Sequence, residues 1–229
     1  MLLHTAAWPE IEAYLKTSTG IIIPIGSTEQ HGPNGLIGTD AICPEVIARE
    51  AGDEAGVLVG PTFNVGVAQH HLGFPGSMTL RPTTMIAALN DWIDSLARHG
   101  FEKIYFLNGH GGNIATIGAA FAESYSNWSF DGEACPYELM QRNWWDLPGV
   151  MDMCRSLFPV GEGSHATASE VSVTYYAYPE HVKDVVMSPK IAPNGRFTDA
   201  DNYRKTFPDG RIGSDPAQAT PEKGATIVQ

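Results

Sequence analysis

Cysteine is scarce in this sequence, and long apolar runs are missing from it. The three cysteines, Cys43, Cys135 and Cys154, lie far apart and form no Cys-x-x-Cys pair. This usage argues against a disulfide framework or a cysteine–zinc cluster and favours a reduced, cytoplasmic protein. The N-terminal stretch MLLHTAAWPEIEAYL lacks the basic start and the apolar core of a signal peptide. No apolar run approaches the roughly 20 residues of a transmembrane helix, so we expect no membrane partner.

Basic residues are also in short supply. The 229 residues include 14 Lys and Arg against 26 Asp and Glu, which gives a net charge of −12. Nucleic acids and anionic membranes both bind to basic faces, so neither is an expected partner. Hydrophobic residues make up 43% of the chain, enough to fill the core of one domain, and we expect residues 1–229 to form a single domain.

Short β-branched runs alternate with helical patterns along the chain. Buried strands are predicted at 20–26, 57–60 and 103–107, another within 134–147, and a possible edge strand within 71–80. Helices are predicted at 39–51, 81–100, 114–125 and 165–179, followed by an irregular stretch at 182–213 and a short helix after residue 220. This alternation predicts an α/β fold in which helices flank a central, mostly parallel β-sheet.

The stretch STEQHGPNGLIGTD, residues 27–40, directly follows the first predicted strand. Glu29 and His31 are two residues apart, so in extended chain their side chains point to the same side. Together with Asp40 they offer ligands that suit Zn²⁺, Mn²⁺ or Fe²⁺. The alternative is a solvated loop in which Thr39 or Asp40 merely caps the following helix. From this stretch alone both interpretations stand.

Two further motifs carry candidate chemistry. NGHGGN (108–113) follows the strand at 103–107 and contains His110. Its place at a carboxyl end of the sheet favours a ligand or a proton-transfer group, although a glycine-rich turn before a helix also binds anions. GEGSHATASEVS (161–172) contains His165 and Glu170. There Thr167 and Glu170 also match a capping box, which would explain Glu170 without any catalytic role.

Two pairs of aromatic residues have no assigned chemistry, and one type of catalysis is disfavoured. Trp144 and Trp145 adjoin in a predicted strand, where neighbours point to opposite faces, so one of them is expected to line a pocket. His70 and His71 form a loop pair to which the sequence assigns no role. A serine nucleophile is disfavoured because no Gly-x-Ser-x-Gly elbow occurs.

Taken in order, five pieces of the sequence resemble the creatininase (creatinine amidohydrolase) family: PIGSTEQHGPNGLIGTD, HLGFPGSMTLRP, NGHGGN, HATASEVS and DPAQATPEKG. They extend over nearly the whole chain. The resemblance implies an α/β fold with a divalent metal site, often binuclear. It also implies hydrolysis of a small, frequently cyclic, non-peptide amide, and assembly into a homo-oligomer, commonly a hexamer.

The resemblance also assigns roles by position. It implies metal ligation by Glu29, His31, Asp40, His110 and Glu170, with Asp40 able to bridge two ions. It implies catalytic roles for His165 and Glu170, and substrate contacts from Gly111, Gly112, Trp145 and Ser77. Creatininases proper carry Tyr-Glu where this chain has Gly111 and Gly112. We therefore do not expect creatinine itself as the substrate, and we expect Glu170 to complete a second metal position.

The leading hypothesis is a metal-dependent amidohydrolase with one or two Zn, Mn or Fe ions. A metal-bound hydroxide would attack the amide carbon, His165 would protonate the leaving nitrogen, and the backbone amides of NGHGGN would help to hold the oxyanion. One alternative is a non-catalytic α/β protein that binds a phosphate or nucleotide at the glycine-rich turn. Another is a decayed family member that retains a single structural metal.

Overall fold

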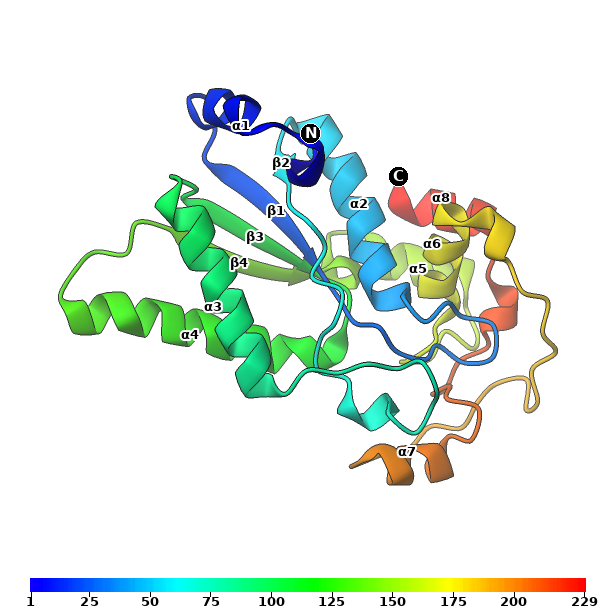
Figure 1. The fold of residues 1–229 in the computed structure, drawn as a ribbon. Coiled ribbons are helices and arrows are strands. Elements are labelled where there is room, and N and C mark those ends of the chain that lie inside the picture. The colour runs from blue at the N-terminus through cyan, green and yellow to red at the C-terminus, as the bar shows by residue number, and fades with distance from the viewer.

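The computed structural model describes residues 1–229 and contains one four-stranded sheet. Its strands are β1 (Gly20–Ile25), β2 (Leu58–Val59), β3 (Lys103–Asn108) and β4 (Glu138–Asn143), in the order β2-β1-β3-β4 (Figure 1). Every pairing is parallel, and Ile21 of β1 lies opposite both Leu58 and Ile104. The predicted α/β fold with a parallel central sheet is therefore confirmed.

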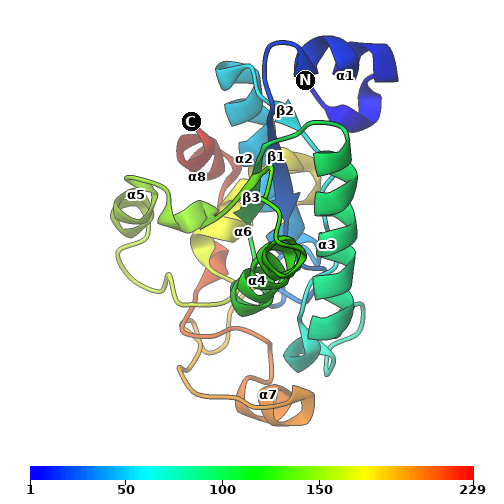
Figure 2. The same cartoon turned by 90° about the vertical axis from the view of Figure 1, so that its left-hand side faces the viewer.

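Helices cover both faces of this sheet. They are α1 (Trp8–Leu15), α2 (Thr39–Ala55), α3 (Pro82–Arg98), α4 (Ile114–Asp131), α5 (Val150–Leu157), α6 (Ala168–Ala177), α7 (Ala200–Thr206) and α8 (Pro221–Val228). Short 3₁₀ turns lie at Leu3–Thr5, Gln69–His71, Gly111–Asn113, Trp144–Asp146, Pro179–His181 and Pro216–Gln218. Figure 2 shows α3 on one side of the strands and α2, α5 and α8 on the other. None of the helices combines the length and the apolar composition that a bilayer span requires.

Alternation along β1 divides the core into two parts. Ile21, Ile23 and Ile25 are at most 1% exposed and pack with side chains of α3 and α4. Ile22 points to the opposite face, where it packs with the cluster formed by α2, α5, α6 and α8. Because both faces are covered, the strands read as continuous β-branched runs rather than as alternating polar and apolar residues.

Several elements differ from the sequence prediction. The predicted edge strand at 71–80 does not form, and only an isolated antiparallel bridge joins Met78 to Thr28. The stretch at 182–213, predicted to be irregular, contains α7, which Asp199 caps by accepting a hydrogen bond from the Asn202 backbone N–H. Helices α1 and α5 were not predicted either. Each has eight residues, so its apolar pattern is too brief to stand out.

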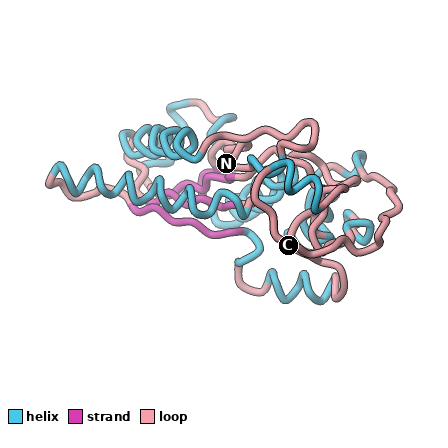
Figure 3. Tube along the Cα trace, turned by 90° about the horizontal axis from the view of Figure 1, so that it is seen from below, coloured by secondary structure: helices cyan, strands magenta, loops and turns pink.

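The strand order places a topological switch between β1 and β3. The chain leaves β1 through α2 to reach β2 on one side, and later returns to β3 on the other. Loops at the carboxyl ends of strands beside such a switch diverge, and ligands bind between them. Figure 3 shows most of the loop chain gathered at one end of the sheet. The segments after β1 and β3 therefore lie where a site is expected.

Candidate metal centre

The loop after β1 and the first turn of the helix that follows it supply three of the candidate ligands, Glu29, His31 and Asp40. Glu29 is held by a hydrogen bond from its N–H to the Ile37 carbonyl oxygen, at 2.8 Å, and His31 pairs with Gly35 across a tight turn. Helix α2 then begins at Thr39 with Gly38 as its N-cap, and no side chain caps it. The predicted cap at Thr39 or Asp40 is therefore wrong. Because it is not used as a cap, the Asp40 carboxylate faces the other ligands.

Two glycines bring the start of α2 against the ends of both central strands. A side chain at Gly26, after β1, or at Gly109, after β3, would collide with the carbonyl oxygen of Asp40. Glycine is required at both positions because only a bare backbone permits so close an approach. This packing places His110, the next residue after Gly109, beside the Asp40 side chain.

Glu170 reaches the same place from α6. The predicted capping box forms: the Thr167 N–H donates to Glu170 Oε1 at 2.5 Å, and the Glu170 N–H donates to Thr167 Oγ1 at 3.2 Å. The same Oε1 lies 3.9 Å from His31 Nε2. The capping role and the role in the cluster are therefore compatible, and the first fixes the carboxylate for the second.

Asp40 lies between two groups of ligand atoms. Its Oδ1 is 2.8 Å from His31 Nε2, and its Oδ2 is 2.7 Å from His110 Nδ1. Two triads share Asp40: His31, Asp40 and Glu170 form one, and Glu29, Asp40 and His110 the other. A third group, Glu29, His31 and His165, does not contain Asp40, and within each of the three the ligand atoms lie within 4.8 Å of one another. Zinc–ligand distances of about 2.0–2.2 Å place tetrahedral ligand atoms about 3.3 Å apart. The spacing of both triads is of this order.

Burial makes the charge of this cluster costly without a cation. Glu29 and His31 are 0% exposed, and both carboxylate oxygens of Glu29 lack a hydrogen-bond partner. His110 Nε2 lies 3.3 Å from Glu29 Oε2, and the His110 ring is also the neighbour of Asp40 Oδ2, at 2.7 Å. Buried carboxylate oxygens without partners are rare, because desolvation is repaid only by hydrogen bonds or cations. The carboxylate and imidazole donors fit Zn²⁺, Mn²⁺ or Fe²⁺.

The buried carboxylates also favour the protonated, positively charged forms of the neighbouring imidazoles of His31 and His110. Burial opposes protonation of His31, but the Asp40 carboxylate in contact with it raises its pKa to about 10. Burial likewise opposes protonation of His110. The carboxylates of Glu29 and Asp40 outweigh this effect and raise the pKa of His110 to about 9. In the absence of a cation, protons on these rings neutralise the carboxylates that a divalent ion would otherwise bind.

A cavity of about 320 Å³ opens onto the cluster. Its lining includes four side chains of the cluster or beside it, Asp40, His110, His165 and Glu170, together with Trp145, Met151 and Glu162. Trp144 and Trp145 belong to a 3₁₀ turn rather than to a strand, and both line the cavity, so the prediction that they point to opposite sheet faces is wrong.

The remaining predicted residues occupy different positions. Gly111 lines the cavity, whereas Gly112 and Ser77 do not. Ser77 instead accepts a hydrogen bond from the Gln30 N–H at 3.1 Å and so fixes the ligand loop. His165 lies beside the cluster, with its Nδ1 3.9 Å from Glu29 Oε1. Burial, reinforced by the neighbouring His31 and His71, lowers the pKa of His165.

Sequence reasoning missed His71 and Gln30. His71 Nε2 lies 3.0 Å from Glu29 Oε1, and its Nδ1 lies 2.9 Å from Gln30 Nε2. Both residues belong to the stretches that resemble the creatininase family, and this resemblance was the one signal in the sequence that could have identified them.

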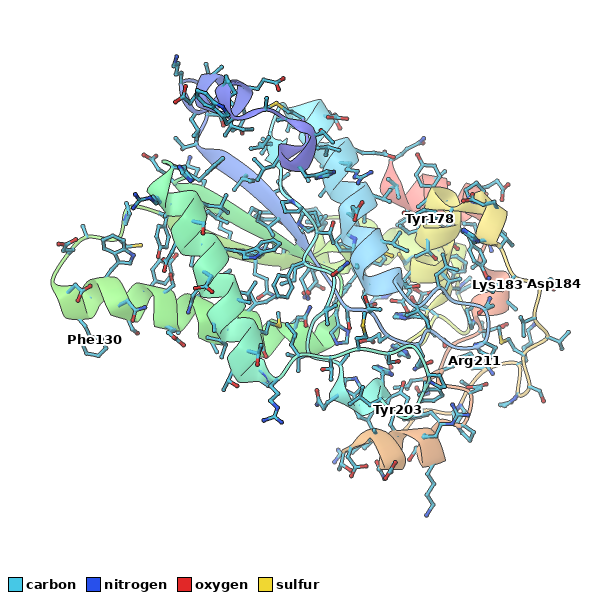
Figure 4. The ribbon with its side chains drawn as sticks, viewed as in Figure 1. Phe130, Tyr178, Lys183, Asp184, Tyr203 and Arg211 are labelled. Atoms are coloured by element: carbon cyan, nitrogen blue, oxygen red, sulfur yellow. The ribbon has the colours of Figure 1, made fainter.

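Tyr203 on α7 and Arg211 lie among the loops at the same end of the molecule (Figure 4). The Tyr203 hydroxyl donates to the Gly210 carbonyl oxygen at 2.8 Å.

Gly112→Ala is expected to weaken metal binding by about 10- to 100-fold, the usual effect of disturbing a group that orients a ligand. A Cβ at position 112 would lie 2.6 Å from the Val67 carbonyl oxygen and closer still to His110 Nε2, so the ring must move. Gly111→Ala is the matched control, because a Cβ there meets no atom within 4 Å. Zinc dissociation constants, measured by competition with a chelator, check the difference. Equal affinities in the two variants would contradict it.

Comparisons of sequence and of structure both identify creatinine amidohydrolases as similar proteins. The family model described as creatinine amidohydrolase matches residues 4–229. The chain is 26% identical to the creatinine amidohydrolase of Pseudomonas putida over 235 aligned positions, which cover 97% of this chain and 89% of that protein. It is 32% identical to the mycofactocin precursor peptide peptidase of Mycolicibacterium smegmatis over 108 aligned positions. This alignment covers 44% of this chain and 43% of that protein.

A solved structure designated creatininase Mn superposes with a TM-score of 0.82 at 25% sequence identity. The superposition covers 99% of this chain and 92% of the creatininase chain. The similarity thus extends over the whole fold, including the loops that carry both ligand triads.

Proposed function

Because the chain belongs to the creatinine amidohydrolase family, we propose that it is a metal-dependent amidohydrolase that acts on a small, non-peptide amide. One observation supports this proposal above all. Two triads of buried ligand atoms share Asp40, and the oxygens of Glu29 have no hydrogen-bond partner. Such a shared carboxylate suits two divalent ions about 3.5–4 Å apart.

The proposed ligands divide between the two positions. Glu29, Asp40 and His110 would hold one ion, and His31, Asp40 and Glu170 the other. Glu170 would take the place of the glutamate that creatininases proper carry at the position of Gly112. Zinc and manganese are the favoured metals, manganese because a relative of the same fold is designated as its manganese form. A bound divalent ion would lower the pKa of water from 15.7 towards about 7 and polarise the amide carbonyl.

The chain's own groups would orient the substrate and move the protons. His165 borders both the cluster and the cavity, so it is the residue we propose to transfer a proton to the leaving nitrogen. The backbone of Gly111 lies at the cavity wall beside His110, where its N–H would donate to the carbonyl oxygen of the amide. Trp145 and Met151 would pack against the rest of the substrate.

The size of the cavity restricts the substrate. A volume of about 320 Å³ lies at the lower end of the roughly 300–1,000 Å³ of typical small-molecule sites. A small amide, cyclic or open, therefore suits this cavity. On the family resemblance, we further propose that the chain forms a homo-oligomer, a hexamer, and works in the cytoplasm. Light scattering of the purified protein tests the assembly.

A phosphate- or nucleotide-binding protein is disfavoured by charge. The glycine-rich turn that would hold a phosphate carries His110, whose ring lies within 3.3 Å of two carboxylates, Glu29 and Asp40. These carboxylates repel an anion and attract a cation. A decayed enzyme with one structural metal is also disfavoured, because Glu170 lies where it would complete the triad that Gly112 leaves short of a ligand.

Chelation followed by reconstitution tests the proposed function. Protein stripped of metal is expected to lose hydrolysis of its amide by about 10³-fold or more, because the charge stabilisation supplied by the ion is lost. Addition of Zn²⁺ or Mn²⁺ is expected to restore it. The assay uses a panel of cyclic ureides, formamides and small linear amides. Hydrolysis that persists undiminished in the stripped protein would contradict the proposal.

A further inference from the structure

Gln30 lies between two proposed metal ligands, Glu29 and His31, and is 6% exposed. The orientation of its amide is fixed by two backbone groups. The Gly32 N–H donates to Oε1 at 2.8 Å, and Nε2 donates to the Gly210 carbonyl oxygen at 3.0 Å. If the amide were flipped, its NH₂ group would face the Gly32 N–H, and its oxygen would face the Gly210 carbonyl oxygen. Both contacts would be repulsive, so the positions of Oε1 and Nε2 are defined.

The Gln30 amide nitrogen also approaches two histidines. It lies 2.9 Å from Nδ1 of His71 and 2.9 Å from Nε2 of His165. An amide nitrogen carries two hydrogens, and one of them is already donated to Gly210. Only one of the two imidazoles can therefore accept the remaining hydrogen.

The backbone of Gln30 decides between them. Its carbonyl oxygen lies 2.9 Å from His165 Nε2, and no other donor reaches it. A carbonyl oxygen can only accept, so His165 must carry a proton on Nε2. If Gln30 donated to His165 instead, this buried carbonyl would be left without a donor. The arrangement in which every acceptor has a donor has Gln30 donating to His71 Nδ1, and it leaves the Nε2 atoms of Gln30 and His165 as two donors 2.9 Å apart.

Both imidazoles are then fixed in defined tautomers. His71 accepts at Nδ1 and carries its proton on Nε2, the nitrogen that lies 3.0 Å from Glu29 Oε1. His165 carries its proton on Nε2 and has a lone pair on Nδ1. That nitrogen faces the cluster, 3.9 Å from the same carboxylate oxygen.

We propose that Gln30 is a positioning residue that sets the tautomers of His71 and His165, so that each neutral ring carries its proton on Nε2 and His165 keeps a lone pair on Nδ1, on the side of the cluster. This inference deepens the proposed function and rests on it only for the next step. His165 would first take a proton from the attacking water at Nδ1. It would then deliver that proton to the leaving nitrogen and return to the neutral ring with which it began.

Nitrogen-15 NMR of the zinc-loaded protein, labelled at its histidine rings, tests the tautomers directly. We expect His71 to be protonated at Nε2 and not at Nδ1, and His165 to be protonated at Nε2 and not at Nδ1. A proton on Nδ1 of either ring would overturn the proposal. The measurement involves no substrate, so its failure is distinguishable from a failure of the proposed hydrolysis.

Gln30→Glu tests the cause of this arrangement, because a carboxylate of the same size accepts hydrogen bonds but donates none. We expect Nδ1 of His71 to become protonated and zinc affinity to fall by about 10- to 100-fold, with a lower kcat and an unchanged KM. Gln141→Glu on β4, whose amide reaches only Asn143, is the matched control and is expected to leave all of these unchanged. An unchanged His71 tautomer in Gln30→Glu would overturn the role of Gln30. If that variant does not fold, the spectrum of the unmodified protein still decides the tautomers.

Discussion

Asp40→Asn is expected to abolish binding at both metal positions and to reduce hydrolysis by about 10³-fold or more. Asp40 is the one side chain common to the two triads proposed to hold the ions. Its Oδ1 lies beside His31 and its Oδ2 beside His110. An amide has the same shape, but it lacks the charge and presents only one oxygen. Each of the two triads that share Asp40 is thus left with two anionic or imidazole ligands, too few to retain an ion at either position. Elemental analysis of the purified variant gives the metal content.

Asp53→Asn provides the matched control for this prediction. Asp53 lies on the same helix, α2, at its exposed end, where it pairs with the N-terminal amine at 3.1 Å. The same chemical change there is expected to leave metal content and hydrolysis unaltered. The assignment of Asp40 would be contradicted by a variant that retains two ions per chain or that hydrolyses amide at the original rate.

Arg211→Met is expected to lower the free energy of unfolding by about 3–5 kcal/mol, because several acceptors lose a buried donor and each such loss costs about 1–3 kcal/mol. Arg211 is 0% exposed, and its Nη2 lies 2.7 Å from Asp209 Oδ2. Its guanidinium also donates to the carbonyl oxygens of Pro189, Lys190 and Ser214. Methionine keeps the aliphatic stem but removes the donors to Asp209 Oδ2 and to the carbonyls of Pro189 and Lys190, whereas the Ser214 carbonyl keeps the Ala192 N–H.

Urea unfolding in the presence of a chelator measures this effect without a contribution from bound metal. Arg155→Met is the matched control, because the Arg155 side chain is 71% exposed and its nearest carboxylate oxygen, on Asp152, is 3.6 Å away. That change is expected to stay within about 0.5 kcal/mol of the parent protein. A loss below about 1 kcal/mol in Arg211→Met would show that the buried pair does not stabilise the fold.

The sequence predicted those parts of the fold that depend on local pattern. β1 and β3 are β-branched or aromatic runs buried on both faces, and the polar stretches that follow them lie at the sheet edge where parallel strands end. This reasoning is sufficient to bring Glu29, His31, Asp40 and His110 towards one another. It was not sufficient for Glu170, because a capping box explains that residue equally well, and only the family resemblance assigned it a second role.

The rest depends on contacts between residues distant in the chain. His71 contacts Glu29 only because the segment after β2 folds back onto the loop after β1, and no local pattern encodes that approach. Arg211 is a charged residue in an irregular stretch, which is typical of solvent-exposed residues. Its burial follows from the carbonyls of residues 189, 190 and 214 that surround it. Trp144 and Trp145 follow β4 directly, and nothing in their sequence distinguishes a 3₁₀ turn from a continued strand.

Anomalous diffraction at the zinc absorption edge, from crystals of the zinc-loaded protein, tests the metal centre most directly. We expect two peaks, one among His31, Asp40 and Glu170 and the other among Glu29, Asp40 and His110, each at about 2.0–2.2 Å from its ligand atoms. The two ions are expected to lie about 3.5–4 Å apart, with Asp40 between them. The absence of any peak at these residues in fully loaded crystals would contradict the metal centre and, with it, the proposed function.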